Sequence, residues 1–173
     1  MARAFCMFLM VCVPACSSLL AKEYLTPIEI GKIQEAQEVD KRIKIYLDAA
    51  ALRLKSAEDR LDGKESAEGD TLEFFTPEEM LEGYYSILRS VMFNLDDAIE
   101  KPTVDRAVLG KVLKSLKTST EKAAKDLAIL KKITEEKKNE QAWNLVNRAI
   151  EITEGAREGA LLGLSRFPEK TKK

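Results

Sequence analysis

The chain has 173 residues, of which 45% are hydrophobic and 33% charged, and its formal net charge is −1. This balance is typical of a globular protein long enough to bury a core, and it excludes a disordered chain. The sequence has no histidine, and its three cysteines (Cys6, Cys12 and Cys16) all lie near the N-terminus. Without that segment the chain lacks imidazole and thiol groups, which excludes histidine-dependent nucleophilic catalysis, histidine-ligated zinc and a ferritin-like di-metal site. We therefore expect no catalytic residue, no cofactor and no metal site.

Residues 1–21 have the pattern of a secretory signal peptide. Arg3 precedes an unbroken apolar run at residues 5–13, and Pro14 follows it. This run is too short for a membrane-spanning helix, which needs about 20 apolar residues. A short apolar run between a basic residue and small residues is typical of an export signal. We predict cleavage after Ala21, which leaves residues 22–173 as a single helical domain that is periplasmic or secreted.

Cys16 offers an alternative end to the signal. The stretch Val13-Pro14-Ala15-Cys16 is similar to the cleavage motif of bacterial lipoproteins, although proline is unusual in its second place. Cleavage before Cys16 would leave this cysteine as a lipidated N-terminus. The protein would then be anchored to a membrane, and only through this lipid.

Two segments have the sequence of a helix start. Thr26-Pro27 and Thr76-Pro77 are each followed by a glutamate three residues after the threonine. In a capping box the threonine hydroxyl accepts a hydrogen bond from the backbone N–H of that glutamate, whose carboxylate accepts one from the threonine N–H. Proline at the first helical position loses no hydrogen bond. We predict Thr26 and Thr76 as helix N-caps.

Apolar residues recur every three or four positions in four long stretches, which predicts amphipathic helices. Polar segments, glycine or proline separate these stretches. The predicted helices cover residues 27–61, 77–100, 103–133 and 142–166. Each has one apolar face, so we predict an all-α fold, an antiparallel bundle of about four long helices after the N-terminal signal segment. A flatter arrangement of long hairpins is the alternative.

Charge is unevenly distributed along the chain. Residues 58–100 contain thirteen acidic and three basic residues, a net charge of −10, whereas residues 101–138 have a net charge of +6. We favour the interpretation that the second and third predicted helices are neighbours whose charges attract. The alternative is a basic face that meets an anionic lipid or polymer. Nucleic acid is not an expected partner, because no set of aromatic residues for base stacking accompanies the lysines.

Three glycines recur at every fourth position, at Gly155, Gly159 and Gly163. A glycine inside a helix costs about 1 kcal/mol relative to alanine, so a compensating gain is expected. We predict that these glycines allow close helix packing, either inside the bundle or against a second copy of the chain.

Three functional hypotheses follow. The leading one is a non-enzymatic exported protein that binds another protein or an envelope surface in a scaffold role, with a homo-oligomer as one form. The alternative is a helical bundle that binds an apolar ligand or lipid, which a large apolar pocket would favour. The remote alternative is a hydrolase that uses carboxylates, which would require a cleft with two facing carboxylates of perturbed pKa.

Overall fold

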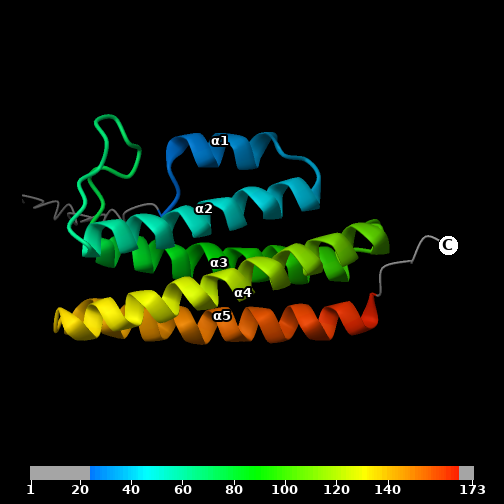
Figure 1. Ribbon diagram of the computed structural model, residues 1–173. Helices are drawn as coiled ribbons and strands as arrows, with labels where there is room; N and C mark the ends of the chain where they lie inside the picture. The colour runs from blue at the N-terminus through cyan, green and yellow to red at the C-terminus, as the bar shows by residue number, and fades with distance from the viewer. Residues whose placement is uncertain (1–23, 168–173) are drawn as a thin grey trace, which may run out of the picture.

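A computed structural model describes residues 24–167, and this part of the chain is helical (Figure 1). The predicted all-α class is confirmed for these residues. The predicted signal segment and Cys16 lie outside them. The helices are α1 (Pro27–Glu35), α2 (Val39–Leu61), α3 (Pro77–Glu100), α4 (Arg106–Glu136) and α5 (Glu140–Arg166).

The first predicted helix is divided in two, so the described residues form five helices rather than about four. Residues 36–38 separate α1 from α2, and Ala36 has an extended backbone with ψ of 99°. The Arg42 guanidinium donates two hydrogen bonds to the Ala36 carbonyl, at 3.2 and 3.0 Å. This carbonyl therefore has a partner outside the α1 ladder, and α1 folds back along the outer side of α2 (Figure 1).

The four long helices form a ring in which α2 packs on α3, α3 on α5, α5 on α4, and α4 on α2. Successive helices run in opposite directions (Figure 1). The molecule is therefore built from two antiparallel hairpins, α2–α3 and α4–α5, and the ring neighbours from different hairpins run parallel. The predicted antiparallel arrangement holds within each hairpin but not between them. Helices α3 and α4, consecutive in sequence, lie on opposite corners of the ring.

The core runs along the centre of this ring and consists of leucine, isoleucine, valine and alanine side chains. The core also contains buried threonines on α4 and α5, and the hydroxyl groups of these threonines form hydrogen bonds. Thr120 donates to the Leu116 carbonyl at 2.9 Å, and Thr153 donates to the Ala149 carbonyl at 2.6 Å. A threonine that donates to its own helix can be buried at little cost.

Both predicted N-caps form complete capping boxes. The Thr26 hydroxyl accepts from the Glu29 N–H at 3.2 Å, and the Thr26 N–H donates to the Glu29 carboxylate at 2.7 Å. The corresponding distances between Thr76 and Glu79 are 3.1 and 2.8 Å. These boxes fix the first residues of α1 and α3.

Arg60, near the end of α2, holds the α2–α3 loop. Its guanidinium donates to the carbonyls of Leu72, Glu73 and Phe75, at 3.0 to 3.1 Å, and to the Ser66 hydroxyl. Polar backbone groups of a loop that lack helical partners are thereby satisfied by one side chain. The loop projects from one end of the bundle (Figure 1).

Candidate functional site

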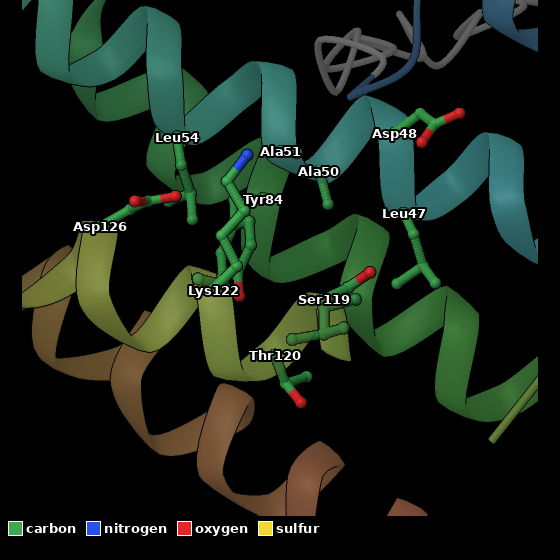
Figure 2. Close-up of a pocket in the computed structure, with 12 residues that line it drawn as sticks. Leu47, Asp48, Ala50, Ala51, Leu54, Tyr84, Ser119, Thr120, Lys122 and Asp126 are labelled. Carbon is green, nitrogen blue, oxygen red and sulfur yellow. The ribbon is translucent and has the colours of Figure 1, made fainter. Parts of the chain in front are cut away.

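The first candidate is a cavity of about 170 Å³ between α2, α3 and α4 (Figure 2). Its walls are mainly apolar, from Leu47, Leu54 and Leu88 among others, and Tyr84 of α3 lies at its base. Lys122 extends from α4 towards α2 across this space (Figure 2). Ala50 and Ala123 leave the space open because their side chains are small. The cavity is suited to a small apolar group.

Tyr84 is buried, and its hydroxyl lies 2.6 Å from that of Thr153. Thr153 gives its only hydroxyl proton to the Ala149 carbonyl, so Tyr84 must be the donor in this pair. Burial raises the pKa of Tyr84 to about 12, although the hydrogen bond with Thr153 acts in the opposite direction. At neutral pH this phenol is therefore neutral, and its role in the arrangement is to join α3 to α5.

Two acidic side chains lie at this cavity. Asp48 and Asp126 line the cavity, but neither is joined to Lys122 by an ion pair. No group of three or more acidic side chains within residues 24–167 could hold a metal ion.

A second candidate is the exposed face of α4, which carries a row of lysines. Because α3 lies on the opposite corner of the ring, its acidic residues are not beside this row. The favoured interpretation of the charge pattern, neighbouring acidic and basic helices, is therefore wrong. Lys111, Lys122 and Lys125 make no ion pair with any residue of the described part. The exposed lysines of the row are Lys111, Lys114, Lys122, Lys125 and Lys132. We call these residues the lysine row.

The acidic residues of α3 lie on the corner of the ring opposite the lysine row of α4. Exposed acidic side chains on this helix are Glu82, Asp96, Asp97 and Glu100. The surface charge of the bundle is thus segregated, with one negative corner at α3 and one positive corner at α4.

A third candidate is a groove of about 420 Å³ on the outer side of the α4–α5 hairpin. Its floor is formed by small and apolar side chains, and its rim carries two lysines and two glutamates. Trp143 lies beside the groove, where its Nε1–H donates to Glu135 at 3.3 Å and its ring is 5.8 Å from the Lys131 ammonium. The lining residues are Ala124, Leu127, Ala128, Lys131, Lys132, Glu135, Ile150, Thr153 and Glu154.

A buried ion pair attaches α1 to the bundle. Arg53 of α2 is 1% exposed, and it donates to both carboxylate oxygens of Glu29, at 3.0 and 2.6 Å, and to the Tyr24 carbonyl at 3.0 Å. Burial by itself raises the pKa of Glu29, but the Arg53 and Thr26 hydrogen bonds outweigh it, so the pKa is lower than usual. This pair was not predicted from the sequence. The available signal was the position of Arg53, three residues after Ala50 and four before Ala57, on the apolar face.

The three glycines of α5 have different surroundings. A Cβ atom on Gly163 would lie 2.6 Å from Leu113, so α4 and α5 pack closely there. At Gly155 and Gly159 a Cβ atom would meet nothing within 4 Å, and both residues are exposed. The prediction of close packing inside the bundle therefore fails for these two, and packing against a second copy stays a prediction.

None of the helices in the described part of the chain is sufficiently long and apolar to cross a membrane. No protein-family model, curated protein or solved structure matches this chain.

Proposed function

We propose that this protein is a non-enzymatic binding protein of the cell envelope, exported by its N-terminal segment, that binds a bilayer surface of anionic phospholipid through the lysine row of α4. The observation that carries the proposal is that Lys111, Lys122 and Lys125 of this row form no ion pair within residues 24–167, because α3 lies on the opposite corner of the ring. A lysine near an anionic bilayer contributes about 1 kcal/mol of attraction, so a few acting together give useful affinity.

Co-sedimentation with vesicles tests this function. The mature chain should bind vesicles that contain phosphatidylglycerol and should not bind vesicles of phosphatidylcholine alone. Reversal of three charges, in K111E/K122E/K125E, should weaken binding at least about tenfold, because attraction is replaced by repulsion.

The matched control is K41E/K44E/K55E, which makes the same change in net charge. These lysines are exposed on α2, where each forms an ion pair with an acidic neighbour. The control should weaken binding much less than the α4 variant. Equal losses in the two variants would show that net charge alone, rather than the lysine row, determines binding.

Binding of a small apolar ligand is a second candidate function, and the cavity beside Tyr84 supports it. Its volume of about 170 Å³ is comparable with a cavity of about 150 Å³ that admits benzene in another protein. Benzene should raise the melting temperature of the wild-type protein but not that of A123L, whose larger side chain fills the space. An equal effect of benzene on both proteins would exclude this cavity as the binding site.

A further inference from the structure

We infer that the α4–α5 groove is the contact surface of a homodimer, in which α4 of a second copy lies antiparallel along α4. Six residues of α4 follow one another at spacings of four and three, the pattern that places side chains along one seam of paired helices. They are Lys117, Glu121, Ala124, Ala128, Lys131 and Glu135. We call them the α4 seam. The last four line the groove. The first two continue the same stripe towards the N-terminus of α4 and form an ion pair with each other at 3.6 Å.

The α4 seam is complementary to itself. Its members are arranged symmetrically about residue 126. Residues 124 and 128 are two positions from it, residues 121 and 131 are five, and residues 117 and 135 are nine. In an antiparallel pair centred on residue 126, Ala124 therefore faces Ala128 of the second copy. Lys131 faces Glu121 in the same way, and Lys117 faces Glu135. A twofold axis repeats every contact, so each dimer would contain four pairs of opposite charge around four alanines.

The exposure of the seam fits this arrangement. Ala128, Glu121 and Glu135 are exposed, whereas Lys117, Ala124 and Lys131 are half-buried. Alanines at the centre allow two helix backbones to approach closely, and charges on either side specify the antiparallel register. The seam is thus small and apolar in the middle and charged towards both ends.

Helix α5 supplies further apolar surface on the same side. Trp143 and Leu161 are 37% and 47% exposed, and Ile150 lines the groove between them. Trp143 also contacts Lys131 and Glu135 of the seam. Helix α1 packs on the other hairpin, so no helix of the described residues covers this face (Figure 1).

The symmetry has a consequence for the lysine row. In this dimer the twofold axis is perpendicular to the plane that contains the two α4 helices. Side chains that project from one side of this plane in one copy therefore project from the same side in the second copy. The lysine rows of the two copies would therefore face one surface together. The dimer does not depend on the proposed membrane binding, because it forms through the seam, and Lys132 is the one member of the lysine row that lines the groove.

Sedimentation equilibrium without lipid tests the dimer separately from the proposed function. The wild-type mature chain should dimerise at micromolar to millimolar concentrations, and E121K should weaken the dimer at least about tenfold by placing like charges opposite Lys131. The double variant E121K/K131E restores opposite charges across the axis and should recover most of the lost affinity. A128R, which places a large side chain at the exposed centre, should also prevent association.

E82K on the exposed face of α3 makes the same charge change as E121K and should leave the dimer unchanged. Circular dichroism identifies any variant that fails to fold. A wild-type chain that remains monomeric at about 1 mM would overturn the inference, as would failure of the folded double variant to recover affinity. Equal weakening by E82K and E121K would also overturn it.

Discussion

At the scale of the residue, Arg53 is a charge enclosed where α1, α2 and α3 meet. Its stem passes 3.7 Å from the place where a Cβ on Gly83 would lie, and its guanidinium reaches Glu29. Removing one partner of such a pair leaves the other charge without compensation in a poorly solvated place. The resulting loss of stability is larger than the net stabilisation that the intact pair provides. The Arg53 Nε has no hydrogen-bond partner within the described residues, so the pair with Glu29 is the main compensation for burial.

Substitution of Arg53 tests this dependence. R53M should lower the free energy of unfolding by about 3–5 kcal/mol, because it leaves the Glu29 carboxylate without its cation. R53M/E29Q removes both charges and should recover part of the loss. Urea denaturation of the single and double variants gives both values. A loss below about 1 kcal/mol in R53M would contradict the assignment of a compensating pair.

The pH dependence of stability follows from the same pair. Because the folded-state pKa of Glu29 lies below its ordinary value of 4.5, the carboxylate stabilises the fold above that value. This contribution is lost as pH falls through the lower folded-state pKa. The wild-type protein should therefore lose more stability between pH 6 and pH 3 than E29Q does. Parallel stability curves for the two proteins over this range would exclude the contribution of Glu29.

At the scale of the element, the sequence predicted where α1 and α3 begin, but it did not predict that α1 ends at Glu35. The Thr-Pro-x-Glu pattern predicted both capping boxes, because every atom of that motif lies within four residues. The break at residues 36–38 was missed, since alanine, glutamine and glutamate are all compatible with a helix. Contacts of Glu29 with Arg53 and of Arg42 with Ala36 hold α1 back against α2. The first of these contacts joins residues too far apart for local periodicity to detect.

Replacing each glycine of α5 with alanine should change the stability of the protein in different directions. G155A and G159A should each stabilise the protein by up to about 1 kcal/mol, because a methyl group meets no neighbour and the helix gains rigidity. G163A should instead destabilise it by about 1–3 kcal/mol, since Leu113 must move. Thermal unfolding monitored by circular dichroism measures all three variants. Destabilisation by G155A or G159A would indicate a close contact at that glycine, as with a second copy.

At the scale of the whole molecule, the order of helices around the ring was not predictable from the sequence. Periodicity shows which face of a helix is apolar, but not which helix covers that face. Four helices joined by short connections can pack with α3 and α4 adjacent or opposite. The structure places them opposite, so the acidic side chains of α3 do not lie beside the lysine row of α4. The candidate surfaces were predicted only in part: the basic segment was recognised, whereas the groove and the α1 ion pair required the tertiary structure.

Charge segregation over the whole bundle predicts how salt acts. Raising the ionic strength from about 0.05 to 0.5 M should weaken vesicle binding by at least about tenfold, because exposed charges are screened over a few ångströms at high salt. The free energy of unfolding should change little, since the core is apolar. Vesicle co-sedimentation and urea denaturation at the same salt concentrations measure these two effects. Salt-independent vesicle binding would point to an apolar or lipid-anchored mode instead.

The diagonal connection at residues 101–105 also affects the order in which the chain folds. Contacts within each hairpin join residues near in sequence, whereas the Tyr84–Thr153 hydrogen bond between hairpins joins residues 69 positions apart. Closing a longer loop costs more entropy, so hairpin formation is favoured first and docking of the two hairpins second. Substitutions at contacts between α3 and α5 should therefore mainly accelerate unfolding, whereas those inside a hairpin should also slow folding.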